Sequence, residues 1–180
     1  MSERSVGETL ENVFKDAKSR IIAATFASNI HRIQQIINSA VKFNRKVALS
    51  GRSIINVANT AIKLGYLNVP PDTLWDIDEI QKLPNDQIVL ITTGSQGEPM
   101  SALSRMATNT HRKVSIQEGD LVVISASPIT GNEKYISRVI NELFKQGANV
   151  IYEALAEVHV SGHARQEELK LIHRLVRPKF

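Results

Sequence analysis

Short apolar runs alternate with helix-patterned segments along this chain, and that alternation constrains the fold more than any other feature. The runs lie at residues 21–25, 46–49, 87–92, 120–125 and 148–152. Between them, apolar residues recur at the three- and four-residue spacing of amphipathic helices. Parallel strands need crossover connections, and helices supply those connections here. The sequence therefore predicts an α/β fold with a Rossmann-like, three-layer parallel sheet.

The helical segments can be bounded from the same pattern and from residues that begin or end helices. Helices are predicted over residues 6–20, 30–45, 54–64, 75–83, 100–107, 133–146 and 165–176. Ser28 and Asn29 precede the second helix and are N-cap candidates. In the last helix we expect one apolar face to turn inward, formed by Leu169, Leu171, Ile172, Leu175 and Val176.

Composition narrows the class of protein. At 180 residues, with 42% hydrophobic and 22% charged residues, we expect one globular domain over residues 1–180. The chain has no Cys, which excludes disulfides and thiolate metal sites and suits a reducing cytosol. No apolar run approaches the roughly 20 residues of a membrane span. We therefore expect a cytoplasmic protein with no membrane partner, and the net charge of +4 permits nucleic acid or phosphate binding.

A glycine-rich loop follows the third apolar run. Its residues, Gly94, Ser95, Gln96 and Gly97, offer backbone N–H groups and a hydroxyl at the start of a helix, an arrangement that suits phosphate. The alternative is that glycine and serine only turn the chain. The loop lacks the Gly-Lys-Ser/Thr ending of a P-loop and is not a dinucleotide fingerprint, so neither ATP nor NAD is predicted.

A second polar motif follows the fifth apolar run, His159-Val160-Ser161-Gly162-His163-Ala164. Imidazoles serve as metal ligands, general acids or phosphate donors, and the alternative is a pair of structural loop histidines. Ser161 and His163 could form a nucleophile and base, but no Gly-x-Ser-x-Gly elbow surrounds them. The remaining histidines are on other elements, so no complete metal site is predicted in this chain.

Three segments, residues 25–32, 92–99 and 159–164, resemble the β-CASP domain of bacterial ribonuclease J in order and spacing. The resemblance covers essentially the whole chain. It implies a domain inserted into a metallo-β-lactamase domain, with RNA cleaved between the two by zinc ions. It further implies 5′-to-3′ exoribonuclease and endoribonuclease activity in RNA maturation and decay, with preference for a 5′ monophosphate.

The resemblance also implies roles for individual residues. His163 matches the histidine beside the scissile phosphate and would transfer a proton, so it is the candidate catalytic residue. The candidate substrate-binding residues are His159, Val160, Ser161, Gly162, His163, Ser28, Asn29, Gly94, Ser95, Gln96 and Gly97.

The chain departs from the family pattern because it lacks the metallo-β-lactamase His-x-His-x-Asp-His motif. We therefore expect a β-CASP domain excised from a homo-oligomeric zinc ribonuclease, with no metal of its own, inactive alone and partnered by RNA and the metallo-β-lactamase domain. One alternative is a self-contained binder of small phosphates or nucleotides, and another is a structural assembly module.

Overall fold

The computed structural model describes residues 3–152, 158 and 164–179, and in it five parallel strands form one sheet. The strand order is β2-β3-β1-β4-β5. The strands are β1 (Ile21–Ala24), β2 (Lys46–Ser50), β3 (Ile88–Thr92), β4 (Leu121–Ile124) and β5 (Asn149–Ile151). The predicted α/β fold is confirmed.

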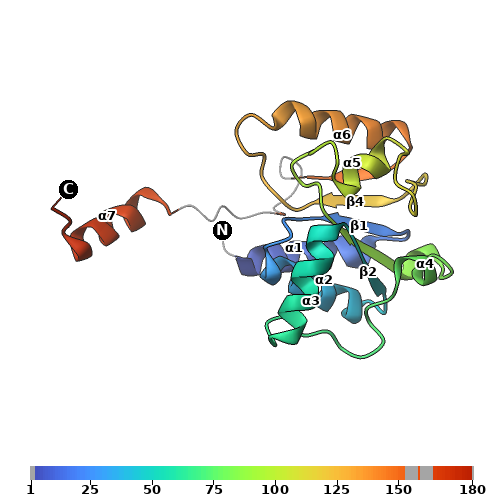
Figure 1. The fold of residues 1–180 in the computed structure, drawn as a ribbon, viewed down its shortest axis with the longest axis horizontal. Coiled ribbons are helices and arrows are strands. Elements are labelled where there is room, and N and C mark those ends of the chain that lie inside the picture. The colour runs from blue at the N-terminus through green and yellow to red at the C-terminus, as the bar shows by residue number, and fades with distance from the viewer. Residues whose placement is uncertain (1–2, 153–157, 159–163, 180) are drawn as a thin grey trace.

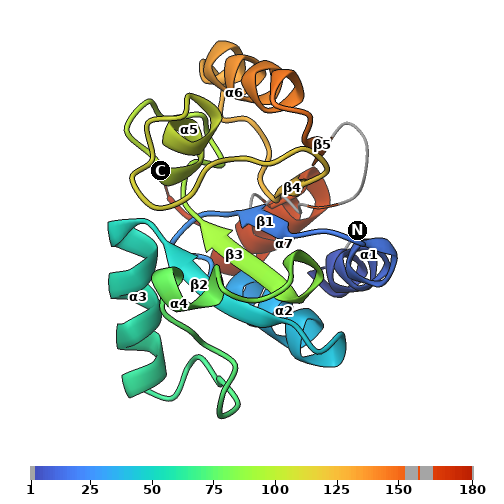
Figure 2. The same ribbon diagram turned by 90° about the vertical axis from the view of Figure 1, so that its right-hand side faces the viewer.

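Helices cover both faces of the sheet, which gives the three layers that were predicted (Figure 1). They are α1 (Glu3–Asp16), α2 (Ile30–Lys42), α3 (Arg52–Lys63), α4 (Ile77–Ile80), α5 (Ala102–Ala107), α6 (Glu133–Lys145) and α7 (Gln166–Val176), with a 3-10 turn η1 (Asn85–Gln87) before β3. Helices α1, α2 and α3 lie on one face, and α5 and α6 lie on the other, as Figure 2 shows from the side.

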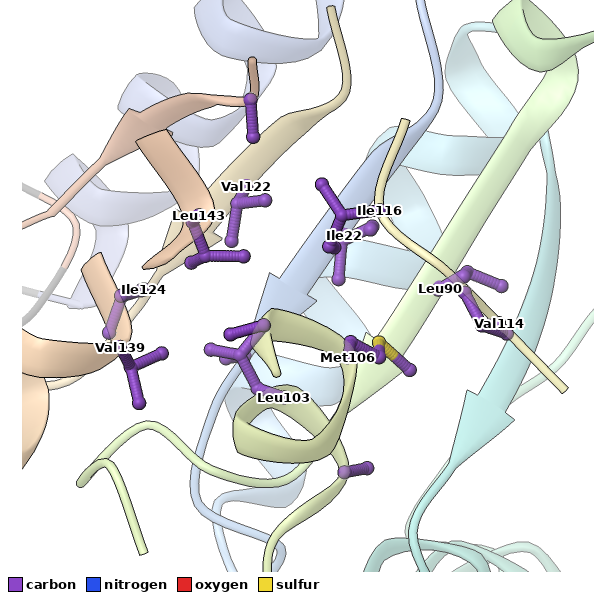
Figure 3. Packing of buried hydrophobic residues seen from close by; sticks show 14 of the residues in the cluster. Ile22, Leu90, Leu103, Met106, Val114, Ile116, Val122, Ile124, Val139 and Leu143 are labelled. Carbon is purple, nitrogen blue, oxygen red and sulfur yellow. The ribbon is translucent and has the colours of Figure 1, made fainter. Parts of the chain in front are cut away.

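The strands are buried on both faces, which explains why they read as continuous apolar runs rather than as alternating patterns. In β1, Ile21 packs with residues of α1, α2 and α3, while its neighbour Ile22 packs with residues of α5 and α6. On the second face, Leu103 of α5 and Leu143 of α6 meet Ile22 and Leu90 (Figure 3). Each of these side chains is at most 1% exposed, so the sheet has two separate apolar cores.

A buried ion pair joins the amino ends of β1 and β4. Arg20 Nε lies 3.1 Å from Asp120 Oδ1, and Arg20 Nη2 lies 2.5 Å from Asp120 Oδ2. The side chains are 3% and 1% exposed. Arg20 also donates to the Ser115 carbonyl, and the Gln117 N–H donates to Asp120, so both charges are hydrogen-bonded beyond the pair. Such additional hydrogen bonds are what a buried ion pair needs to offset the loss of water.

The crossovers leave the carboxyl edge of the sheet toward opposite faces. The loops after β1 and β2 lead to α2 and α3 on one face, whereas the loops after β3 and β4 lead to α5 and α6 on the other. Strand β1 lies between β3 and β4, so neighbouring loops diverge at its carboxyl end. Ligands of open α/β sheets bind at such points.

The last helix differs from its prediction. The predicted inner face of α7 is exposed, with side chains between 57% and 71% accessible, namely Leu169, Leu171, Ile172, Leu175 and Val176. Figure 1 shows why: α7 lies away from the sheet, and its apolar stripe meets neither core. Within the described residues, no helix is long and apolar enough to cross a membrane.

Candidate functional site

Hydrogen bonds between strand ends bring the polar loops together at the carboxyl edge. The Thr25 N–H, at the end of β1, donates to the Thr92 carbonyl at the end of β3, over 3.1 Å. On the other side, the Ser125 N–H donates to the Ala24 carbonyl over 2.8 Å. The loops after β1, β3 and β4 therefore start side by side. Two of the three predicted substrate-binding segments, residues 28–29 and 94–97, share this edge.

Asn29 and Ser28 occupy the turn from β1 into α2. Asn29 Oδ1 accepts a hydrogen bond from the Arg32 N–H over 3.0 Å, so Asn29 is the N-cap of α2, as predicted. Ser28 is exposed. Both residues line the end of a groove of about 610 Å³ that continues between α2 and α3 toward the exposed Tyr66. The turn thus presents a hydroxyl to solvent while the amide oxygen of Asn29 holds the helix.

The side chain of Gln96 ties the loop after β3 to the loop after β4. It is 2% exposed, and its Nε2 donates to the Ser127 carbonyl over 2.9 Å. Its Oε1 accepts from the Ile129 N–H over 2.8 Å. Both polar ends of this side chain are thus engaged within the protein, and Gln96 fixes the spacing of the two loops.

Gly94 and Gly97 are required in this loop because neighbouring atoms lie too close to leave room for a Cβ. Gly97 has φ of +71°, and a Cβ built on it would lie 2.5 Å from the carbonyl carbon of Tyr135 and 2.7 Å from the Ile136 nitrogen. Gly94 has φ of +111°, and its Cβ would collide with Ser101 Oγ. The loop is consequently seated against the first turns of α5 and α6, with Ser95 buried between the glycines at 2% exposure.

The third predicted segment, with its five residues His159, Val160, Ser161, Gly162 and His163, lies outside the described residues. Its immediate neighbour Val158 is described and fully buried. The Val158 carbonyl accepts hydrogen bonds from Ser125 Oγ and from Arg32 Nη1, each over 2.5 Å. Since Ser125 directly follows β4, the Val158 carbonyl lies at the carboxyl end of that strand.

A further polar cluster, which the sequence reasoning did not assemble, lies beside the end of β2. Ser50 Oγ and His111 Nε2 are 3.1 Å apart, at a cavity of about 350 Å³. His111 Nδ1 accepts from the Lys113 and Val114 N–H groups, over 3.3 and 3.1 Å. The ring hydrogen is therefore on Nε2, which donates to Ser50. His111 cannot take a proton from Ser50 in this state, so the pair is not a nucleophile and base.

The environment of His111 favours its neutral form. Burial lowers the pKa of the imidazole below its usual value, and the positive charges of Arg105 and Lys113 lower the pKa further. A serine and a histidine 61 positions apart carry no local sequence signal. Ser50 and His111 come together only in the fold, in which β2 lies beside β3.

The described residues do not fit a metal site. Over residues 3–152, 158 and 164–179, no group of three His, Cys, Asp or Glu side chains is placed to hold a metal ion. His31 and His173 lie on α2 and α7.

The diverging loops, the seated glycine loop and the hydrogen-bonded Val158 carbonyl define a site whose family can now be tested. The family model described as "Ribonuclease J, beta-CASP domain" matches residues 18–143, which is more than half of the chain. The chain belongs to the ribonuclease J β-CASP family. The match includes the turn at Ser28 and the glycine loop, and ends within α6.

The curated relatives described next are all named ribonuclease J. Ribonuclease J of Helicobacter pylori strain 26695 is 48% identical over 99% of this chain and 26% of its own length. Ribonuclease J of Thermus thermophilus is 48% identical over 99% of this chain and 31% of its own length. The enzyme of Mycobacterium tuberculosis H37Rv is 48% identical over 99% and 32% respectively. The chain thus spans about a quarter to a third of these relatives.

Proposed function

We propose that this chain is the RNA-binding β-CASP portion of a ribonuclease J, excised as a single domain from a longer cytoplasmic enzyme. The supporting observation is the carboxyl edge of the sheet, where the loops after β1, β3 and β4 start side by side and the Val158 carbonyl is anchored. The names and the degree of identity of the relatives support an RNA substrate.

In this proposal, hydrogen-bond donors in these segments bind the phosphate oxygens of the RNA. The hydroxyls of Ser28 and Ser161, the Gly162 N–H and the His159 and His163 imidazoles are donors suited to phosphate oxygens. Asn29 and Gln96 already use their side-chain oxygens inside the protein, so they contribute mainly by holding the loops.

The proposed substrate is RNA with a 5′ monophosphate, cut from its 5′ end and also internally during RNA maturation and decay. His163 would lie beside the scissile phosphate and transfer a proton. Zinc would supply an activated water in the whole enzyme. Its ligands would belong to the metallo-β-lactamase domain, whose His-x-His-x-Asp-His motif this sequence lacks. The chain alone would bind without cutting, and the whole enzyme would be a homo-oligomer.

An NMR titration of this chain tests the proposal. The ligands are a short oligoribonucleotide with a 5′ monophosphate and the same oligomer with a 5′ hydroxyl. We expect the amide signals of Ser28, Ser95, Ser161 and His163 to shift, and to shift more with the monophosphate. Saturable binding of a mononucleotide without binding of the oligomer would favour the small-ligand alternative instead. The absence of any shift at millimolar ligand would contradict autonomous RNA binding by this domain.

The role of His163 needs the whole enzyme. Replacing His163 with Ala should lower the cleavage rate by about 10²- to 10⁴-fold, the usual contribution of a proton-transfer group. The RNA affinity should fall much less, since one phosphate contact contributes about 1–3 kcal/mol. Equal losses of rate and affinity would contradict proton transfer.

A further inference from the structure

A cavity of about 350 Å³ lies beside the end of β2, and none of the predicted substrate-binding residues lines it. Its walls come from the end of β2, the first turns of α3, the chain that leads into α4 and the loop that carries His111. Figure 2 shows α3 and α4 next to β2. Small-molecule sites enclose about 300–1,000 Å³. The cavity therefore suits one small molecule or one unit of a polymer.

An indole ring forms part of the wall and is held in place. Trp75 Nε1 donates to Asp72 Oδ1 over 3.0 Å, and the Trp75 N–H donates to the Val47 carbonyl over 2.8 Å. Lys46 Nζ lies 5.8 Å from the centroid of the ring. The other apolar side chains at the cavity are Leu49, Ile55, Leu74 and Ile77. A fixed aromatic ring among aliphatic side chains favours a flat ligand, because flat rings stack on aromatic surfaces.

The most buried polar group at the cavity is the hydroxyl of Ser50, whose side chain is 2% exposed. Because His111 Nε2 donates to Ser50 Oγ, the serine oxygen is the acceptor of that bond and keeps its own hydrogen. Within the part of the chain that the structure describes, no acceptor receives this hydrogen. A buried donor without an acceptor is costly, so a ligand atom that accepts from Ser50 would be stabilised here.

The charges around the cavity make it a poor site for an anion. Burial and the positive charges of Arg105 and Lys113 lower the pKa of His111, so the imidazole is uncharged at neutral pH. Lys113 Nζ is paired with Asp78 Oδ2 over 2.5 Å, and Asp76 adds a carboxylate to the wall. Asp76 Oδ1 accepts from the Asp78 N–H, which leaves Oδ2 for a ligand. We expect an uncharged ligand with an acceptor for Ser50 and a donor for Asp76.

The cavity adjoins the glycine loop after β3. Ser50 is in register with Thr92 of β3, and the Thr93 N–H donates to the Ser50 carbonyl over 3.3 Å. Thr93 directly precedes Gly94, the first residue of the loop. One strand spacing, about 4.8 Å, therefore separates the start of the predicted phosphate loop from the wall of the cavity.

We propose that this cavity is a nucleobase subsite, in which the base lies against Trp75, accepts from the Ser50 hydroxyl and donates an N–H to Asp76. A nucleobase fits because it is flat and uncharged and carries donors and acceptors on its edge. The inference rests on the proposed function for the source of the base, which is the RNA strand at the glycine loop. A free nucleoside offers the same chemistry, and the test separates the two sources.

The fluorescence of Trp75, the single tryptophan of the chain, reports on the cavity directly. The chain is titrated separately with uridine, with adenosine, with ribose 5-phosphate and with a 5′-monophosphorylated oligoribonucleotide. We expect saturable quenching by the nucleosides and by the oligomer, and none by ribose 5-phosphate, which has no base. An equal response to ribose 5-phosphate would overturn the inference, as would the absence of any response to the nucleosides and the oligomer.

Two pairs of variants locate the binding. Ser50→Ala should weaken nucleoside binding by about 2- to 12-fold, the loss expected for one hydrogen bond. Its control is Ser39→Ala, a buried serine of α2 that lies outside the cavity, which should change binding by less than about twofold. Ile55→Phe narrows the cavity and should weaken binding, whereas Leu64→Phe at the end of α3 should not. The second pair tests the inference even if Ser50→Ala does not fold, and equal affinities within both pairs would overturn it.

The outcomes also separate this inference from the proposed function. Quenching by nucleosides without any binding of the oligomer would contradict RNA binding by this chain and leave the nucleobase subsite supported. Amide shifts with the oligomer, but no change in Trp75 fluorescence, would support the proposed function and overturn the subsite.

Discussion

Replacing Gly97 with Ala tests how tightly the loop after β3 is seated on α6. The new Cβ would lie 2.5 Å from the carbonyl carbon of Tyr135 and 2.7 Å from the Ile136 nitrogen. Backbone atoms cannot swing aside as a side chain can. Gly65 is the matched control because its φ is +75°, close to the +71° of Gly97, while an added Cβ meets nothing within 4 Å.

The free energies of unfolding can be estimated separately for the two effects. A left-handed conformation costs a residue with a Cβ about 1–2 kcal/mol, and both variants carry that cost. Forced close contact adds about 1–3 kcal/mol, and only the Gly97 variant carries it. For a chain of this size the additional loss corresponds to a Tm lower by about 3–9 °C.

Urea denaturation at 25 °C, followed by circular dichroism, measures both free energies of unfolding under the same conditions. The variant of Gly97 should unfold at clearly lower urea than the variant of Gly65. Free energies that agree within about 0.5 kcal/mol would refute the close packing of loop against helix. In that case the loop would be free to move, and Gly97 would be required only for its backbone conformation.

Three other perturbations follow from the structure. The pKa of His111 is lowered in the folded chain, so the unfolded chain takes up a proton first as the pH falls below about 6.5. The free energy of unfolding should therefore decrease in that range. His111→Gln should make the urea midpoints depend less on pH there. Asp120→Ala leaves the charge of Arg20 buried without its carboxylate and should lower the free energy of unfolding by about 3–5 kcal/mol in urea denaturation. The double variant Arg20→Met with Asp120→Leu should lose less than the sum of its single variants, and additive losses would contradict a coupled pair. Asn29→Ala removes the cap of α2 and should cost about 1 kcal/mol, and Asn29→Ser should restore most of it; equal stability of the two variants would show that the cap contributes little.

The strands were predictable to within one residue at each end because both of their faces are buried. An unbroken apolar run such as residues 88–91 is typical of a parallel strand that is buried on both faces. Helix ends were predicted less accurately than strand ends, and α4 is an example. Asp76 Oδ1 accepts from the Asp78 N–H and starts α4 there, although apolar spacing suggested a longer helix from residue 75.

The sequence proposes the candidate site as a list of residues, whereas the contacts of the described ones come only from the fold. The pattern around Gln96 suggested phosphate, and only the fold shows that its side chain joins two loops. The contacts of Arg32 and Ser50 could not be predicted because their partners, Val158 and His111, are remote along the chain. The apolar pattern of α7 predicts an amphipathic helix correctly, but periodicity does not say against which surface such a stripe lies.

The central place of β1 in the sheet has a consequence for how the chain is made. Ile21 pairs with Val89 of β3 on one side and with Leu121 of β4 on the other, so the earliest of these five strands waits for partners that are synthesised much later. Loops of that size close slowly, and an unpaired apolar strand invites intermolecular pairing. A nascent chain that pauses between β3 and β4 presents its central strand with one bare edge, which is the kind of surface that a chaperone or a neighbouring nascent chain captures.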